Sequence, residues 1–425
     1  PVPPLSQFKA FLEGSGAREM STTMAVVRLL GTLLKDPALG RFVVPIVPDE
    51  ARTFGMDGLF GQAGIYAPAG QQYKPVDADT LAPYREAEDG QILQEGICET
   101  GAMASFLAAG TAYANFAVPT IPFYIFYSIF GFQRVGDMIW AAGDAMARGF
   151  LLGGTSGRTT LNGEGLQHQD GHSQLMALTV PNLRSYDPAF AFELMVIIRD
   201  GIERMYGRGE DTFYYLTVTN QNEVMPALPG LGTAEEGAVI EGIIRGLYAF
   251  ETVAPRGGPA APAPQANLLG SGAIMKEVRE AARLLAAEGV AVTVWSVTSY
   301  GELARDGRAA ERAKRLDPSS ARKAFVAEAL AEAEGVFVSA SDYMSALGEL
   351  ISRWIPGPYA VLGTDGYGLS ESRAALRDHF EVSAAWVAHA ALGLLEAEGR
   401  LGQGTARAFA QAQGLRLEKL DAATY

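Results

Sequence analysis

Apolar positions recur along this chain at two spacings, and segments of the two kinds follow one another. Between Ser21, which suits a helix cap, and Pro37, which stops a helix, apolar residues recur every three or four positions. A compact apolar run over residues 42–47 then predicts a buried strand. Because helix and strand signals keep alternating as far as residue 219, the pattern predicts a layered α/β fold with a mostly parallel sheet.

A second α/β unit is predicted after a Pro-rich linker. We therefore expect two domains, residues 1–229 and 230–425, each a mostly parallel sheet flanked by helices. A Pro/Ala/Gly insertion over 254–266 and the polar stretch 67–90 should both be surface excursions. The other predicted elements are helices over 100–114, 135–148 and 190–206, strands over 116–132, 150–152, 213–219 and 290–297, and a strand-to-helix turn at 267–273.

Glu99 stands out among the polar residues because it lies where an apolar strand turns into an Ala-rich helix. The helix predicted over 100–114 carries no charge, so we expect it to lie in the interior with Glu99 at its start. One interpretation of Glu99 is a helix-capping acceptor at the positive end of the helix. The other is an acid held in a dry pocket, where it shares a proton with a ligand nitrogen. Taken alone, the local pattern favours the cap.

Composition narrows the class of protein. With 425 residues, of which 48% are hydrophobic and 19% charged, the chain is typical of a globular protein of two or three domains. A formal charge of -14 argues against nucleic acid or an anionic membrane as a general partner. Pro119 and Pro122 interrupt the longest apolar run, which argues against a membrane span. Cys98 is the only cysteine, which excludes disulfides within the chain, and we expect a buried thiol in a reducing, cytoplasmic compartment.

Two further motifs invite functional interpretations. The Gly-Ser-Gly turn at 270–272 is similar to a dinucleotide-binding turn, but its third glycine is missing and the next strand ends without an acid for a ribose. Residues 163–172 gather two histidines with Glu164 and Asp170. The glycines there favour a loop, and a third metal ligand is not evident, so metal binding has little support. Imidazoles in such a loop can instead exchange protons near neutral pH.

The motifs around Glu99 form a recognisable series. Gly-Ile-x-Glu ends at Glu99, an Ala/Gly-rich helix follows, and an aromatic segment then ends in the pair Arg134 and Asp137. This series resembles the pyrimidine-binding domain of the transketolase superfamily, whose members use thiamine diphosphate. Over nearly all of its length the chain also resembles the family of homodimeric pyruvate dehydrogenase E1 components, through the segments 46–56, 140–144, 153–168 and 362–368. The two predicted domains then correspond to a pyrimidine-binding domain and a transketolase-like C-terminal domain.

The resemblance implies a set of cofactor-binding residues. In the family, the glutamate at the position of Glu99 hydrogen-bonds N1′ of the cofactor's aminopyrimidine ring. Phe130 then corresponds to the aromatic residue that stacks on this ring, and Ile97 lines the same site. Tyr127 points its hydroxyl group toward the reacting centre. By periodicity alone, Tyr127 and Phe130 are ordinary core aromatic residues.

Two more residues correspond to family positions close to the substrate. His168 fits the family's Gly-x-Gly-x-x-His pattern and is implied to face the substrate, whereas His172 is as well explained as a residue that braces the loop. Glu50 follows a predicted strand, where active-site residues gather in parallel sheets. The alternatives for Glu50 are a surface charge or a partner for Arg52.

The resemblance further implies an activity and its partners. Members of this family decarboxylate pyruvate and pass the acetyl group to the lipoyl group of the E2 dihydrolipoyl acetyltransferase, with thiamine diphosphate and Mg²⁺ as cofactors, and the resemblance implies the same reaction and a homodimer here. Family members hold Mg²⁺ through a Gly-Asp-Gly motif, whereas this chain has Gly-Asp-Ala at 143–145, and Asn162 lies too near to serve as the later asparagine ligand. We therefore expect the Mg²⁺ ligands in a preceding domain, this chain to be the C-terminal half, and the chain alone to be inactive.

Two alternatives stay open. A sister enzyme that acts on another 2-oxo acid, or a transketolase-type enzyme, shares the same motifs, and kinetics on different substrates separates it from the first hypothesis. A non-catalytic partner or scaffold subunit shares the fold without the chemistry. The non-catalytic subunit is favoured if the reading frame begins near Pro1 with its own start codon and no adjacent frame encodes a Gly-Asp-Gly domain.

Overall fold

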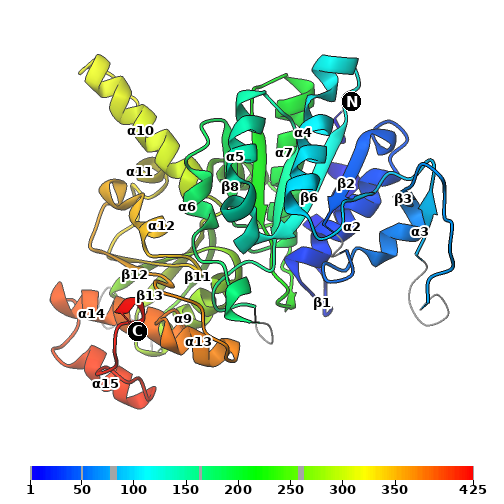
Figure 1. The fold of residues 1–425 in the computed structure, drawn as a ribbon. Helices are drawn as coiled ribbons and strands as arrows, with labels where there is room; N and C mark the ends of the chain where they lie inside the picture. Colours follow the sequence, from blue (N-terminus) through cyan, green and yellow to red (C-terminus); the bar gives the residue numbers. More distant parts are fainter. Residues whose placement is uncertain (1, 49–50, 77–83, 162–164, 257–262, 425) are drawn as a thin grey trace. The chain divides into compact units, whose positions relative to one another are not determined.

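The computed structural model describes residues 2–48, 51–76, 84–161, 165–256 and 263–424 (Figure 1). Its residues cluster into two compact units. Unit 1 comprises 1–156, 176–185 and 190–227, and unit 2 comprises 157–175, 186–189 and 228–425. Each unit is described by itself below. The domain boundary predicted between residues 229 and 230 stays a prediction.

Unit 1 is built on a six-stranded sheet. Five neighbouring strands pair in parallel, in the order β5, β2, β6, β7 and β9. The aromatic and aliphatic side chains of its central strands are buried on both faces, which is typical of a parallel sheet covered by helices. The predicted α/β class with a parallel sheet is therefore confirmed for this unit. The strand order is β5 (Leu93–Gln94), β2 (Val43–Val47), β6 (Ile121–Tyr127), β7 (Phe150–Gly154), β9 (Phe213–Thr217) and β8 (Leu183–Tyr186).

The helices of unit 1 pack on this sheet and on one another (Figure 1). Helix α2 begins where the sequence predicts, because Ser21 Oγ accepts a hydrogen bond from the Met24 amide at 3.1 Å. Helix α4 lies against β6 and α5, whereas α2 packs against α7. The helices are α1 (Lys9–Leu12), α2 (Thr22–Leu34), α3 (Phe60–Ala63), α4 (Glu99–Phe116), α5 (Ser128–Asp144), α6 (Ser173–Ala177, shared with unit 2) and α7 (Ala191–Ile202).

The aromatic segment at 116–132 is not one strand, and that prediction is wrong. Strand β6 ends at Tyr127, and α5 begins at the next residue. Gly131 lies inside α5, where a Cβ atom would collide with the Phe126 ring. The missing side chain lets the helix start directly against the strand it follows, so an apolar run that reads as one long strand is a strand joined to a helix.

Unit 2 contains a five-stranded sheet in the order β11-β13-β12-β14-β15. Strands β12 to β15 pair in parallel, which confirms the predicted mostly parallel sheet, whereas the edge strand β11 is antiparallel to β13. The sequence analysis did not anticipate β11. The strands are β11 (Tyr248–Val253), β12 (Gln265–Gly270), β13 (Ala291–Ser296), β14 (Val336–Ala340) and β15 (Tyr359–Leu362).

Helices flank the sheet of unit 2, with α9 and α14 packed together and α10 against α11 (Figure 1). They are α8 (Glu236–Arg245), α9 (Met275–Ala287), α10 (Tyr300–Leu316), α11 (Phe325–Ala329), α12 (Ala346–Glu349), α13 (Arg373–His379), α14 (Ala384–Ala397) and α15 (Thr405–Ala412).

Unit 1 also contains two short strand pairs. They join β1 (Glu19–Met20) to β10 (Glu223–Val224) and β3 (Ile65–Tyr66) to β4 (Glu86–Ala87). Within the described ranges, no helix is long and apolar enough to cross a bilayer.

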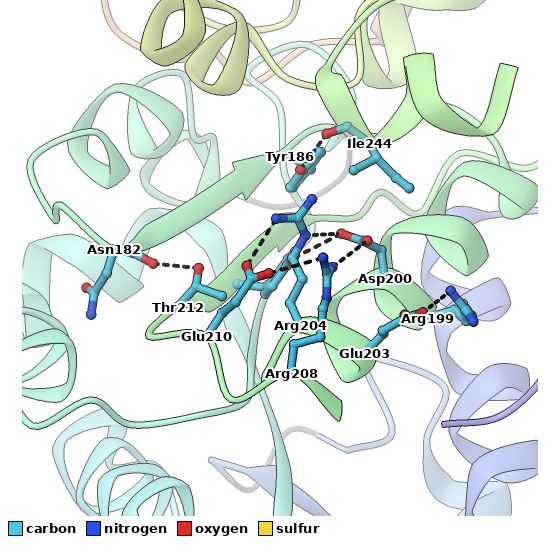
Figure 2. A network of polar contacts seen from close by, with 11 residues as sticks. Asn182, Tyr186, Arg199, Asp200, Glu203, Arg204, Arg208, Glu210, Thr212 and Ile244 are labelled. Carbon is cyan, nitrogen blue, oxygen red and sulfur yellow. Dashed lines mark hydrogen bonds and ion pairs between the residues drawn. The ribbon is translucent and has the colours of Figure 1, made fainter. Parts of the chain in front are cut away.

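A polar network closes the end of α7 in unit 1 (Figure 2). Asp200 accepts from Arg204 Nε at 2.6 Å and from the Tyr214 hydroxyl at 3.3 Å. Arg204 and Arg208 both pair with Glu210, at 3.1 and 3.2 Å. Burial lowers the pKa of Arg204, but the hydrogen bond and charge of Asp200 outweigh it and raise that pKa above its usual value. The Asp200 carboxylate therefore ties α7 to strand β9.

The substitution Asp200→Asn is expected to destabilise the protein by about 2 kcal/mol, because it leaves two arginines facing a partly buried neutral group. Chemical denaturation followed by circular dichroism measures this change. The control is Glu13→Gln, which removes an exposed pair with Lys9 on α1 and should cost under about 0.5 kcal/mol. Equal stability of the two variants would contradict the structural role of Asp200.

Candidate active site

Glu99 is the first residue of α4, but it is not the cap. The cap is Cys98, whose Sγ accepts from the Gly101 amide at 3.3 Å. The Glu99 carboxylate instead pairs with Arg134, with Oε1 2.6 Å from Nη1. Only 12% of the Glu99 side chain is exposed, compared with 47% for Arg134. The capping interpretation is therefore wrong, although the positive end of α4 still favours a negative charge at this place.

Two other expectations about this region are also wrong. Cys98 is exposed, not buried, because it lies on the loop that caps α4. Helix α4 does not lie in the interior, since only Ala102, Met103, Phe106 and Gly110 are buried and Phe116 is 76% exposed. An uncharged Ala-rich sequence reflects high helix propensity as much as burial, and α4 buries one stripe against the sheet.

Two aromatic residues lie beside the ion pair of Glu99 and Arg134. Tyr127 ends β6, and its ring centroid is 6.0 Å from that of Phe130 in an edge-to-face arrangement. Phe130 lies in the first turn of α5, and the Arg134 guanidinium, one turn later, stacks on its ring at 3.8 Å. Both rings are half-buried. Arg134 thus connects the Glu99 carboxylate to the face of Phe130.

Tyr124 contacts the backbone of Glu99. Its hydroxyl donates to the Glu99 carbonyl oxygen at 3.2 Å. Burial and then the Glu99 charge raise the pKa of Tyr124 well above its usual value, so it remains a neutral donor. Sequence reasoning missed both Tyr124 and the role of Arg134. The available signal for Arg134 was its place four residues after Phe130, which predicts a shared helix face only once α5 is known to begin at Ser128.

The remaining predicted residues of this region are placed less centrally. Ile97 lies on the loop before α4 and is 77% exposed, so it is not part of a packed wall. Glu50 lies outside the described residues, as does Asn162. The structure therefore brings Glu99, Tyr127 and Phe130 together in unit 1 and leaves Ile97 at the surface.

His168 belongs to unit 2, where it ends the short 3-10 helix Leu166–His168. It is half-buried. His172 contacts the buried Arg158, with 3.5 Å between Nδ1 and Nη2, which supports the loop-bracing interpretation. Asp170 accepts from the amides of His172 and Ser173 at 2.9 and 3.0 Å, so its carboxylate is used in a turn. Among the described residues, no group of three acids, histidines or cysteines is placed to hold a metal ion.

The Gly-Ser-Gly turn at 270–272 is occupied by the chain itself. Ser271 Oγ donates to the Asp187 carboxylate at 2.9 Å, and the Gly272 amide donates to the Asp187 carbonyl oxygen at 3.0 Å. A dinucleotide phosphate at this turn would have to displace a carboxylate of like charge. This arrangement supports the rejection of a nicotinamide site.

Comparison with known families assigns the chain. The model of the family described as "Pyruvate dehydrogenase E1 component middle domain" matches residues 4–226. The chain belongs to this pyruvate dehydrogenase E1 family. A second model, described as "Transketolase-like TK C-terminal domain", matches residues 246–383. The resemblance drawn from the sequence motifs is therefore confirmed.

Curated relatives of the family cover nearly all of the chain. The pyruvate dehydrogenase E1 component of Pseudomonas aeruginosa is 54% identical over 402 residues, which are 94% of this chain and 44% of that protein. The E1 component of Escherichia coli K12 is 52% identical over 404 residues, again 94% of this chain and 44% of the relative. The chain thus spans less than half the length of these relatives.

The solved structures show the fold. Transketolase from Leishmania mexicana superposes with a TM-score of 0.64 at 17% identity and covers 94% of this chain and 50% of the transketolase chain. At this identity the likeness shows the fold alone. The predicted transketolase-like α/β fold is confirmed.

Proposed function

We propose that this chain supplies the aminopyrimidine-binding part of a thiamine diphosphate-dependent pyruvate dehydrogenase E1. The enzyme decarboxylates pyruvate and transfers the acetyl group to the lipoyl group of the E2 dihydrolipoyl acetyltransferase. The observation that carries the proposal is the Glu99 carboxylate, which is mostly buried at the positive end of α4 with the Phe130 ring close by through Arg134. Family membership and the names of the E1 relatives support the choice of reaction.

The residues of unit 1 suit an aminopyrimidine. Such a ring needs an acceptor that can share a proton at N1′ and an aromatic face to lie on, and Glu99 and Phe130 supply these two groups. Thiamine diphosphate, when bound, supplies the electron sink that decarboxylation of a 2-oxo acid requires. Glu99 would hold the proton at N1′, while Tyr127 would direct its hydroxyl group to the reacting atoms. Ile97 would line the outer edge of the ring from its exposed loop.

His168 and Glu50 are proposed to act on the substrate side. An imidazole can donate or accept a proton near neutral pH, which suits a carbonyl oxygen that gains and loses charge during the reaction. Glu50 is proposed to lie near the substrate. Sequence correspondence to the family supports both assignments.

The other cofactor and the partners follow from the same proposal. Mg²⁺ is proposed to be held by residues outside this chain, because the described acids form no metal-binding group and the relatives are more than twice as long. A homodimer, an E2 lipoyl partner and a cytoplasmic location are proposed on the same family grounds. We also propose that the 425-residue chain alone is inactive.

The test compares the protein encoded by the complete reading frame with the 425-residue chain. With thiamine diphosphate and Mg²⁺, the complete protein should release carbon dioxide from pyruvate and reductively acetylate a lipoyl domain, and the 425-residue chain should do neither. A preference for another 2-oxo acid or for a sugar phosphate would favour a sister enzyme. Absence of activity from the complete protein on every such substrate would favour a non-catalytic subunit.

A further inference from the structure

The carboxyl ends of the central strands of the unit 2 sheet are contacted by other segments of the same unit. Strand β12 pairs with β13 on one side and β14 on the other, and the ends Gly270 and Ala340 lie opposite each other. In open α/β sheets, ligands bind in the crevice beyond such strand ends. Here Asp187 occupies the β12 side at Ser271, while residues 158–160 occupy the β14 side at Asp342.

Asp342 is the centre of the β14 side. Its Oδ1 accepts from the Thr159 amide at 2.9 Å and from the Thr159 hydroxyl at 2.8 Å, and its Oδ2 accepts from the Thr160 hydroxyl at 2.5 Å. The Arg158 amide donates to the Asp342 carbonyl oxygen at 3.2 Å. All four of these residues are buried. One carboxylate therefore fixes the backbone and both hydroxyl groups of the threonine pair.

Two arginines of α13 also contact the threonine pair. Arg373 Nε donates to the Thr160 carbonyl oxygen at 2.6 Å. Arg377 Nη2 lies 3.3 Å from the Thr160 hydroxyl, and its Nη1 pairs with Glu277 at 2.9 Å. Arg377 is 4% exposed, so this arginine is held in the interior between the Glu277 carboxylate and the Thr160 hydroxyl group.

The anchored residues lead directly to His168. Gln169, its neighbour, is buried and donates from Nε2 to the carbonyl oxygens of Leu161 at 3.2 Å and Leu369 at 2.9 Å. Gln169 Oε1 accepts from the Leu369 amide at 2.9 Å. The contacts form a continuous series from Asp342 through the threonine pair and Leu161 to the residue next to His168.

Burial of the Asp342 carboxylate carries an electrostatic cost. Burial raises the pKa of Asp342 above its usual value even though Arg377 and the threonine donors lower it, so the folded state is penalised for keeping the charge. Above that raised pKa the ionised group weakens the fold relative to the unfolded chain, and this penalty shrinks as the pH falls from the raised pKa toward the pKa of the unfolded chain. The three hydrogen bonds that Asp342 accepts from the threonine pair fix the conformation of that pair.

We propose that Asp342 is a positioning residue that fixes residues 158–161 within unit 2 and thereby sets the orientation of His168. The proposal rests on the proposed function, because it assigns a purpose to holding His168 still. It concerns residues of unit 2 alone and adds a determinant in the C-terminal domain to a reaction proposed for the residues of unit 1.

The test measures hydrogen exchange and turnover in the protein encoded by the complete reading frame. Asp342→Asn and the milder, isosteric Thr160→Val should each speed amide exchange over 158–161 by about tenfold, the effect of losing one buried charge-assisted bond. The control is Asp306→Asn, which weakens the 2.6 Å hydrogen bond that the amide of Phe325, the first residue of α11, donates to the Asp306 carboxylate. This control should destabilise unit 2 without speeding exchange over 158–161.

Turnover of pyruvate separates positioning from general damage. Asp342→Asn should lower kcat by about tenfold and leave KM for pyruvate nearly unchanged, and it should have little further effect when His168 is already replaced by Gln. Unchanged exchange in both variants, or fully additive effects of Asp342→Asn and His168→Gln on kcat, would overturn the proposal. The exchange measurement needs no catalysis, so faster exchange with normal turnover in His168→Gln would refute the role proposed for His168 while leaving the anchor established.

Discussion

The substitution Glu99→Gln in the complete enzyme is expected to lower kcat for pyruvate by at least about 100-fold, the usual range for loss of a positioned proton-sharing group. Gln keeps the size and the hydrogen-bonding capacity of Glu but cannot share a proton with N1′. The fold should survive, because the lost ion pair joins Glu99 to an arginine that is 47% exposed and such pairs contribute under about 1 kcal/mol. Carbon dioxide release at saturating cofactor measures the change in turnover, and thermal unfolding checks the fold.

The matched control for Glu99 is Glu95, an acid four residues earlier. Its carboxylate accepts a hydrogen bond from the Ser105 hydroxyl on α4. Glu95→Gln therefore perturbs the start of the same helix without touching the proposed proton partner, and its turnover should stay within about threefold of the wild type. Near-normal turnover of Glu99→Gln, or equal losses in the two variants, would contradict the role of Glu99.

The second large effect is expected for His168→Gln, which should lower kcat by about 100-fold with a smaller change in KM. Gln fills a similar space and can hydrogen-bond, but it cannot transfer a proton near neutral pH. Steady-state kinetics on pyruvate measures both constants. The control is His172→Gln, four residues later in the same segment, where the imidazole contacts Arg158. A larger loss of kcat in His172→Gln than in His168→Gln would exchange the roles of the two histidines.

The α/β layers could be predicted from the sequence because the central strands carry their own signal. Strands β7 and β9 are short apolar runs between helical segments, and both lie within a residue or two of their predicted positions. The cap at Ser21 also acts as predicted, because a cap depends on residues within one turn. Local patterns therefore located the elements wherever local chemistry decides them.

Predictions failed where a contact distant in the sequence, or the surface, decides the outcome. In the sequence Gly131 is typical of a turn. In the structure the Phe126 ring lies where a Cβ atom of Gly131 would be, and α5 begins earlier than the sequence predicts. Helix α4 looks interior because it lacks charge, yet alanine tolerates either environment. A buried thiol was predicted at Cys98 because free cysteine usually behaves as a small buried residue, but the cap position of α4 is exposed.

In the candidate site, too, some residues could be predicted from the sequence and their contacts with distant residues could not. Glu99 and Phe130 were found by family resemblance, and the structure places them beside the same arginine. The Arg134 pair could not be predicted because it joins residues 35 positions apart across two helices. The anchor from Asp342 to the threonine pair spans more than 180 positions and needs the complete sheet of unit 2 to bring it together. Such pairings depend on tertiary structure that no local pattern contains.

The central claim is that Glu99 is the proton partner of an aminopyrimidine ring, and the most direct measurement is an experimental structure of the complete enzyme with thiamine diphosphate and Mg²⁺. We expect a Glu99 carboxylate oxygen to lie about 2.6–3.0 Å from N1′, with the ring against Phe130. A structure in which N1′ is hydrogen-bonded elsewhere, while Glu99 remains paired only with Arg134, would contradict it.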